Sequence, residues 1–227
     1  MQPSSLHTGS AEPRRRAAFF DLDGTIADSI GLMRQVYRRF VTSLGGSPSD
    51  EEFDRMNGVP LGRVLDLLVE AHGIDAPAEN LLARYHGVID EAYLQVMPFA
   101  EAKPVLEELH RRGWYLALVT SNGRERSSAW LGRHGLSAWF DTLVCAEDVT
   151  HGKPHPEPFL TALRRSGLAA GQAFAIDDAP LGIESAIAAG IRPIVVGEAA
   201  ANGPWGNGVL RAGDLSQVLE ALVRDEV

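Results

Sequence analysis

Residues 17–29 have the sequence AAFFDLDGTIADS, the stretch that most strongly indicates the fold of the chain. The apolar run from Ala17 to Leu22 is typical of a buried strand, and the DLDGT segment at 21–25 is typical of the tight turn that ends it. Residues two apart on a strand point the same way, so the carboxylates of Asp21 and Asp23 are expected side by side. Like charges this close require a cation or a shared proton, which indicates a functional site.

Beyond Phe99 the sequence predicts alternating helices and strands. Helices are expected at 102–112, 125–134, 156–166, 180–189 and 215–223, and strands at 115–119, 142–146, 173–176 and 193–196. Such alternation predicts an α/β fold with a doubly wound, Rossmann-like parallel sheet, because right-handed crossovers place helices on both faces. Ligands of these sheets bind beyond the carboxyl ends of the strands. The Gly-rich stretch 203–213 is expected to be a surface loop.

The segment between the first strand and Phe99 has a different spacing of apolar residues. Its apolar residues Ile30, Met33, Tyr37, Phe40 and Leu44 recur at spacings of 3 and 4, which describes one face of a helix. The same pattern repeats twice before residue 97, without a convincing strand. We therefore expect a small, all-helical inserted domain at 28–97, an α/β catalytic core at 17–27 and 98–227, and a disordered tail at 1–16.

Composition limits the classes of partner. Of the 227 residues, 45% are hydrophobic and 22% charged, as in ordinary globular proteins. The formal net charge of −9 has the wrong sign for binding nucleic acid or an anionic membrane, so small molecules are the expected partners. No apolar run approaches a membrane span, and residues 1–16 contain no stretch of signal-peptide type. The lone cysteine, Cys145, excludes an intramolecular disulfide, which favours a reducing, cytoplasmic setting.

Three further polar groups follow predicted strands. Thr120-Ser121-Asn122 offers hydroxyls, an amide and backbone N–H groups suited to an anion, although Ser121 and Asn122 can equally cap the following helix. Lys153, stiffened by the proline after it, suits a phosphate oxygen or a carboxylate. Asp177 and Asp178 repeat the acidic pair of the first strand, and they can also cap the helix at Pro180.

If these groups converge, they define a chemistry. Carboxylate oxygens in this number favour Mg²⁺, whereas zinc would require His or Cys ligands. Asp21 could attack a metal-bound phosphate and form an aspartyl-phosphate, and Asp23 could protonate the leaving alcohol and then activate water. Lys153, Thr120 and Mg²⁺ would neutralise the charge of the transferring group.

Four ordered segments, at 20–29, 119–122, 152–156 and 176–183, resemble the motifs of the haloacid dehalogenase-like hydrolases. The resemblance covers nearly everything from Ala17 to Val223 and is closest to phosphatases whose helical cap follows the first strand, such as phosphoglycolate phosphatase and beta-phosphoglucomutase-like members. The helical insertion then corresponds to the cap domain.

The resemblance implies a role for each matching residue. Asp21 would be the nucleophile, Asp23 the acid/base, and Thr120 and Lys153 the catalytic phosphate binders. Mg²⁺ would be held by Asp21, by the backbone carbonyl of Asp23 and by Asp178, with Asp177 placed behind these ligands. The positions expected to bind the substrate or its phosphate are Leu22, Gly24, Thr25, Ser121 and Asn122.

The function implied is a Mg²⁺-dependent phosphomonoester hydrolase that acts on a small, sugar-like phosphorylated metabolite. A phosphomutase of the beta-phosphoglucomutase type is the alternative, but this chain has Met33 and Leu61 where those mutases carry a His and an Arg. A receiver-like signalling module also combines acids, a phosphorylatable Asp and Lys-Pro. Receivers are about half as long and lack the helical insertion, which makes this reading more distant.

Overall fold

The computed structural model describes residues 16–56, 59, 61–74 and 77–224. The predicted tail, apart from Arg16, lies outside these ranges. Strands are β1 (Ala17–Phe20), β2 (Ala27–Asp28), β3 (Met97–Pro98), β4 (Tyr115–Val119), β5 (Thr142–Val144), β6 (Ala173–Asp177), β7 (Arg192–Val196) and β8 (Leu210–Ala212). Helices are α1 (Ile30–Ser43), α2 (Asp50–Met56), α3 (Leu61–His72), α4 (Ala78–Tyr93), α5 (Ala102–Arg111), α6 (Arg124–Arg133), α7 (Glu157–Ser166), α8 (Pro180–Ala188), α9 (Glu198–Asn202) and α10 (Leu215–Arg224).

The centre of the molecule is a parallel sheet that, in the described residues, has six strands in the order β5-β4-β1-β6-β7-β8. β1 lies between β4 and β6, and Phe20 is in register with Leu118 on one side and Ile176 on the other. Every residue of β1 is buried. Continuous apolar strands of this kind belong in a sheet that is covered on both faces.

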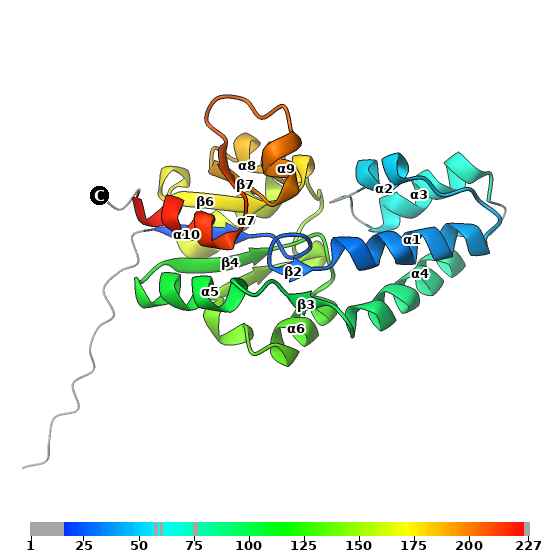
Figure 1. Cartoon of the computed structure of the whole chain (residues 1–227), viewed down its shortest axis with the longest axis horizontal. Helices are drawn as coiled ribbons and strands as arrows, with labels where there is room; N and C mark the ends of the chain where they lie inside the picture. Colours follow the sequence, from blue (N-terminus) through cyan, green and yellow to red (C-terminus); the bar gives the residue numbers. More distant parts are fainter. Residues whose placement is uncertain (1–15, 57–58, 60, 75–76, 225–227) are drawn as a thin grey trace, which may run out of the picture.

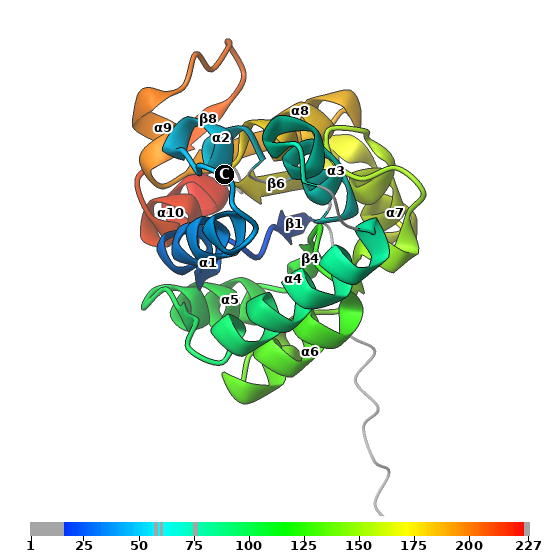
Figure 2. The ribbon, with the colours of Figure 1, turned by 90° about the vertical axis from the view of Figure 1, so that its right-hand side faces the viewer.

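Successive residues of β1 contact different helical layers. Ala18 and Phe20 belong to a hydrophobic cluster with residues of α5 and α10, whereas Ala17 and Phe19 belong to a cluster with residues of α7 and α8. Figure 2 shows α5 and α10 on one side of the strands and α7 and α8 on the other. The predicted doubly wound α/β fold is therefore confirmed.

The helices α1 to α4 form the helical insertion, which lies between β2 and β3 in the sequence and to the right of the sheet in Figure 1. β2 and β3 pair antiparallel, Ala27 with Pro98, where the insertion leaves and rejoins the core. The rings of Phe40 and Tyr85 stack with centroids 4.2 Å apart and so join α1 to α4. The insertion is thus all-helical, as predicted, and it packs through the apolar faces that the sequence spacing indicated.

The structure differs from the sequence-based prediction at short elements. The stretch predicted as a loop at 203–213 contains β8, which pairs with β7 at the sheet edge. A strand of three residues that takes its hydrogen bonds from a neighbour is too short to show alternation in the sequence. β1 ends at Phe20 rather than Leu22, because the carbonyl of Leu22 accepts the N–H groups of Ile26 and Ala27 in the turn.

Within the described ranges, no helix combines the length and the apolar character needed to cross a bilayer.

Candidate active site

The carboxyl ends of β1, β4 and β6 bring the predicted site residues to one edge of the sheet. Asp21 directly follows β1, Thr120 follows β4, and Asp177 ends β6. Because Phe20 is in register with both neighbouring strands, these residues lie at the same level. Parallel pairing thus assembles side chains that are far apart in the sequence.

Lys153 lies between two of these carboxylates. Its Nζ donates a hydrogen bond to Asp21 Oδ1 at 2.6 Å and to Asp177 Oδ2 at 2.7 Å. All three residues are buried. Burial raises the pKa of Asp21 to about 7 against the opposing effect of Lys153. Burial lowers the pKa of Lys153, but the attraction of its ammonium to Asp177 and Asp21 is larger. The pKa of Lys153 is therefore raised, and the side chain stays charged.

Two glycines make room for the acidic pair of β6. A Cβ on Gly24 would lie 2.1 Å from Asp178 Oδ2, and the φ of +75° at Gly24 is also one that favours glycine. A Cβ on Gly182, in the first turn of α8, would lie 1.9 Å from Asp177 Oδ2. These close approaches explain why glycine stands at both positions.

Asp177 and Asp178 have different surroundings. Asp177 Oδ1 accepts the backbone N–H of Ala179 at 3.0 Å, so this side chain braces the turn before α8 as well as holding Lys153. Asp178 receives the Thr25 hydroxyl at 3.4 Å. Burial and the neighbouring Asp177 and Asp21 raise the pKa of Asp178 well above its ordinary value.

The donor set fits a hard divalent cation. Carboxylate oxygens of Asp21, Asp177 and Asp178 lie within 4.8 Å of one another. The ammonium of Lys153 supplies a single positive charge against three carboxylates. The pKa values of Asp21 and Asp178 are raised because both groups are buried and because the neighbouring carboxylates repel their charged forms. A cation with oxygen ligands would relieve both. The sequence analysis placed the backbone carbonyl of Asp23, and not its side chain, beside Asp21 and Asp178, and the Asp23 side chain is engaged elsewhere.

The side chain of Asp23 is held by the helical insertion and by the loop after β4. The hydroxyl of Tyr93, at the end of α4, donates to Asp23 Oδ1, and the amide of Asn122 donates to Asp23 Oδ2. The same amide also donates to the Tyr93 hydroxyl at 2.7 Å. Arg126 donates to Asn122 Oδ1 at 3.0 Å and lies over the Tyr93 ring. This network fixes the orientation of Asp23 beside Asp21.

A cavity of about 140 Å³ connects these groups to the helical insertion. The predicted residues that line it are Asp21, Asp23, Thr120, Ser121, Asn122, Lys153, Asp177 and Asp178. Leu22, Gly24 and Thr25 are not part of this lining. Leu22 packs in the hydrophobic core, the N–H of Gly24 donates to the carbonyl of Ala27, and Thr25 contacts Asp178. The structure therefore gathers most of the predicted site but not these three side chains.

Sequence reasoning missed Tyr93 and Arg126. Tyr93 continues the apolar helical spacing through Tyr85 and Ile89, so in the sequence it is indistinguishable from a core residue. Arg126 lies four residues after Asn122, one helical turn away, which is a weak signal that depends on where α6 begins.

The fold and this strand-end cluster define an α/β enzyme with a buried carboxylate site and a helical insertion above it. The family model described as "Haloacid dehalogenase-like hydrolase" matches residues 18–196. The chain therefore belongs to the haloacid dehalogenase-like hydrolase family, and the classification as an enzyme of the phosphatase type is confirmed.

Named relatives agree with this assignment. The chain is 31% identical over 179 residues to a "Phosphorylated carbohydrates phosphatase" of Thermotoga maritima, covering 78% of this chain and 83% of that one. It is 32% identical over 214 residues to a plasmid-encoded phosphoglycolate phosphatase of Cupriavidus necator, covering 91% and 90%. The beta-phosphoglucomutase of Clostridium difficile shares the fold with a TM-score of 0.82 at 19% identity, covering 93% of this chain and 96% of that one.

Proposed function

We propose that the protein is a Mg²⁺-dependent phosphomonoester hydrolase that acts on a small phosphorylated metabolite through an aspartyl-phosphate. The observation that carries the proposal is the cluster of Asp21, Asp177 and Asp178, of which the buried Asp21 and Asp177 both accept hydrogen bonds from Lys153. The relatives named for phosphorylated carbohydrates and phosphoglycolate support a small phosphate ester as substrate. Asp21, Asp178 and the backbone carbonyl of Asp23 would hold Mg²⁺, which when bound would neutralise phosphate charge.

Asp21 is the proposed nucleophile. Lys153 holds its Oδ1, and no hydrogen bond from the described residues occupies its Oδ2, which leaves that oxygen for attack. The carboxylate forms a bond to phosphorus as the bond from phosphorus to the ester oxygen breaks. Water then attacks the phosphorus of the aspartyl-phosphate, which releases inorganic phosphate and restores the Asp21 carboxylate.

Asp23 is the proposed acid and base. It gives its proton to the leaving alcohol oxygen in the first step and takes a proton from the attacking water in the second. Its two oxygens are oriented by Tyr93 and Asn122, so the proton is transferred at a fixed place beside Asp21. Lys153 and the Thr120 hydroxyl, both on the cavity wall, balance the charge of the transferring group.

The helical insertion is the proposed cap domain, with bounds 28–97, and residues 17–27 and 98–227 form the proposed catalytic core. The insertion closes the side of the cavity opposite the strand ends and so excludes water. Met33 and Leu61, which stand where the mutases carry a His and an Arg, both line this cavity. Apolar side chains cannot take over the proton transfer or phosphate contact of those residues, which favours hydrolysis over phosphomutase activity.

We further propose a cytoplasmic setting and no nucleic-acid or membrane partner. The net charge of −9 supports the absence of a nucleic-acid or anionic-membrane partner, and the lone, buried Cys145 supports a reducing compartment.

The test is the replacement Asp21→Asn. It removes the nucleophile and keeps the side-chain volume, so Mg²⁺-dependent release of phosphate from p-nitrophenyl phosphate should fall by about a thousandfold or more. The matched control is Asp28→Asn, an exposed acid of β2 outside the cavity lining, which should keep full activity. Full activity in Asp21→Asn, with circular dichroism showing a folded protein, would contradict the proposal. Formation of an isomeric sugar phosphate instead of free phosphate would favour the mutase.

A further inference from the structure

The cavity has two chemically different walls. The wall formed by strand ends is polar and charged, as described above. The wall formed by the helical insertion is largely apolar: apart from Tyr93, whose hydroxyl donates to Asp23, its described lining residues are Ile30, Met33, Tyr37, Phe53, Met56, Val59, Leu61, Val64, Tyr85 and Ile89. These side chains come from α1 to α4 and the α2–α3 connection, so the apolar character belongs to the whole insertion rather than to one residue.

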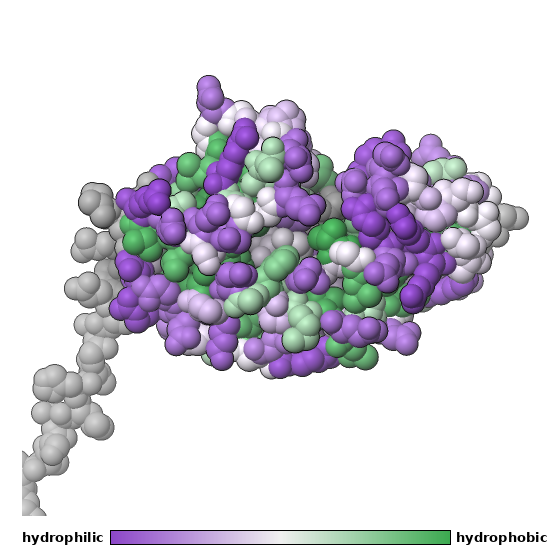
Figure 3. Space-filling view, in the orientation of Figure 1, coloured by the Kyte–Doolittle hydropathy of each residue, from purple (hydrophilic) through white to green (hydrophobic). Residues whose placement is uncertain are grey.

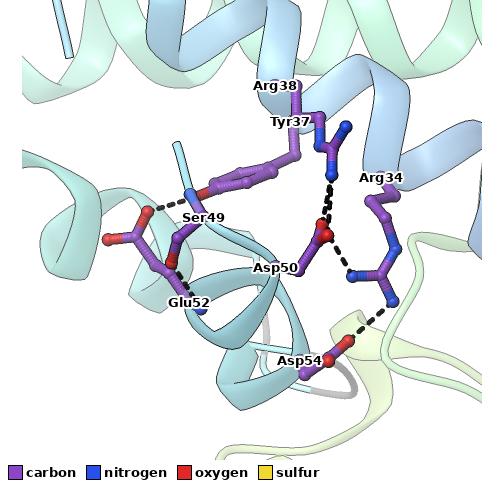
Figure 4. Close-up of polar contacts among 7 residues, drawn as sticks. All are labelled: Arg34, Tyr37, Arg38, Ser49, Asp50, Glu52 and Asp54. Carbon is purple, nitrogen blue, oxygen red and sulfur yellow. Dashed lines mark hydrogen bonds and ion pairs between the residues drawn. The ribbon is translucent and has the colours of Figure 1, made fainter. Parts of the chain in front are cut away.

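Charged side chains of α1 and α2 pair with one another and do not line the cavity, although the Arg34 guanidinium lies over the Phe53 ring, 4.6 Å from its centroid. Arg34 donates to Asp50 at 3.1 Å and to Asp54 at 2.7 Å, and Arg38 donates to both oxygens of Asp50. Figure 4 shows these ion pairs joining α1 to α2. Figure 3 shows hydrophilic side chains gathered on the outer face of the molecule over α1 and α2. The polar groups of α1 and α2 thus serve the surface and the joint between the helices.

The tyrosine hydroxyl nearest to these pairs is also engaged. Tyr37 Oη donates to Glu52 and accepts the backbone N–H of Ser49 at 3.1 Å, an arrangement drawn in Figure 4. Its ring, not its hydroxyl, is therefore what Tyr37 can present to a ligand. Burial without a charged partner raises the pKa of Tyr85 to about 12, so this side chain presents a neutral phenol to the cavity.

The polar groups where the two walls meet are committed to Asp23. Asn122 donates to Asp23 and to Tyr93 and accepts from Arg126. The Arg126 guanidinium also donates to Asp90 at 2.6 Å. A substrate hydroxyl placed here would have to displace hydrogen bonds that orient the proposed acid/base.

From these contacts we infer that the alcohol portion of the substrate is an apolar alkyl or aryl group rather than a polyol. This inference rests on the proposed phosphatase function and concerns the group that leaves with the ester oxygen. The phosphate is held at the strand ends, and the carbon skeleton packs against Met33, Phe53 and Val64. An apolar alcohol differs from the sugar-like substrate that the sequence resemblance implied. It also differs from the substrate class in the name of the relative called a phosphorylated carbohydrates phosphatase.

Energetics decide between the two substrate classes. A sugar hydroxyl moved from water against the aliphatic and phenylalanine side chains of this wall loses hydrogen bonds that these side chains cannot replace, and Tyr85 offers a single phenol hydroxyl to a polyol. Each methylene that contacts the same wall instead leaves water, which is worth about fourfold in affinity. A ring with several hydroxyls is thus disfavoured against its hydrocarbon counterpart of equal size.

The test uses matched phosphate esters with the full-length enzyme and Mg²⁺. Cyclohexyl phosphate and myo-inositol 1-phosphate have the same carbon ring and differ in hydroxyls, and n-propyl phosphate and glycerol 1-phosphate form a shorter pair. We expect kcat/KM for cyclohexyl phosphate to exceed that for the inositol ester by about tenfold or more, and kcat/KM to rise along methyl, ethyl, propyl and butyl phosphate.

A variant links this preference to the apolar wall. Met33→Gln keeps the length of the side chain and adds an amide that can bind hydroxyls, so the cyclohexyl-to-inositol ratio should fall by about threefold to tenfold. The matched control is Leu160→Gln on α7, a leucine that is 38% exposed and outside the cavity lining, which should leave the ratio unchanged.

The outcomes separate the two proposals. If p-nitrophenyl phosphate and every other ester stay intact, the phosphatase proposal fails. If p-nitrophenyl phosphate is hydrolysed but the polyol esters match or surpass their hydrocarbon counterparts, the inference about the alcohol is overturned and the phosphatase proposal stands. A preference for the hydrocarbon esters that Met33→Gln does not reduce would contradict the role of the wall.

Discussion

Tyr93 connects the helical insertion to the chemistry at the end of β1. Its hydroxyl donates to Asp23, and burial together with that carboxylate raises the pKa of Tyr93 well above its ordinary value. The phenol thus stays protonated and remains a donor at neutral pH. Because α4 carries both Tyr93 and the cavity residues Tyr85 and Ile89, the position of the insertion and the orientation of Asp23 are coupled.

Replacement of Tyr93 by Phe should therefore affect the reaction more than binding. The ring is kept while the hydrogen bond to Asp23 is lost, so kcat should fall by about tenfold with little change in KM. Steady-state kinetics with p-nitrophenyl phosphate measure both values. The matched control is Tyr115→Phe, because Tyr115 begins β4 at the end that lies away from the site. An unchanged kcat in Tyr93→Phe would show that the hydroxyl does not serve Asp23.

Gly182 gives a sharp test of the packing around Asp177. In Gly182→Ala the new Cβ would collide with the Asp177 carboxylate, so we expect a loss of about 1–3 kcal/mol in the free energy of unfolding. Gly87→Ala is the matched control, because Gly87 lies inside α4 and a Cβ there would meet no atom within 4 Å. At that position alanine should stabilise by about 0.5–1 kcal/mol. Urea denaturation measures the free energy of unfolding of both variants. If Gly182→Ala were as stable as the unchanged protein, the described packing around Asp177 would be contradicted.

At the residue scale the sequence predicted the groups that carry charge and missed Tyr93 and Arg126, which help to orient them. Asp21, Lys153 and Asp178 were recognisable because charged residues follow three predicted strands in the order of one family's motifs, although each taken alone has an ordinary structural explanation. Tyr93 was not recognisable, because its neighbours in space are set by the packing of α4 against the core. Orientation depends on tertiary contacts that no local pattern encodes.

At the scale of elements, prediction succeeded where a strand is long and central. β4 has the bounds that the apolar run 115–119 predicted, because a strand with neighbours on both sides must be apolar throughout. The edge strand β8, the two-residue strands β2 and β3, and the Ala-rich α9 were missed. Their hydrogen bonds depend on partners far away in the sequence rather than on periodicity of their own.

The edge strand β5 permits a test of local stability through Cys145, which follows it. Burial raises the pKa of this thiol to about 11, so the neutral form persists well above neutral pH. At about pH 8 the native protein should react with iodoacetamide at least a hundredfold more slowly than the urea-unfolded chain, and the native rate should rise as pH approaches 11. Mass spectrometry follows the alkylation. Equal rates would show that β5 opens freely.

At the scale of the whole molecule, the acidic cluster couples pH, metal and stability. A carboxyl whose pKa is raised on folding contributes stability below its unfolded value, and that contribution is lost as pH rises through the folded value. For Asp21 these values are 3.8 and about 7, and the pKa of Asp178 is raised in the same direction. The metal-free protein is therefore expected to lose stability as pH rises from about 4 to about 7.

Mg²⁺ should reverse this loss, because it binds the ionised carboxylates. At a hundredfold excess over Kd, Mg²⁺ would raise the free energy of unfolding by about 2.7 kcal/mol, which corresponds to roughly 5–10 °C in Tm. This stabilisation should be larger at about pH 8 than at about pH 6. Thermal denaturation with and without Mg²⁺ measures the effect. Asp178→Asn should abolish it while Asp28→Asn keeps it. A shift of equal size at both pH values would contradict the coupling.

If Asp21 is the nucleophile, it carries the phosphoryl group during turnover, and that group can be trapped. The enzyme is mixed with Mg²⁺ and p-nitrophenyl phosphate, quenched in acid during turnover, digested, and its peptides analysed by mass spectrometry. We expect a phosphoryl group on the peptide that contains residues 17–29, located at Asp21 and absent from Asp21→Asn. Continued turnover with an unmodified Asp21, or with the phosphoryl group on another residue, would contradict it.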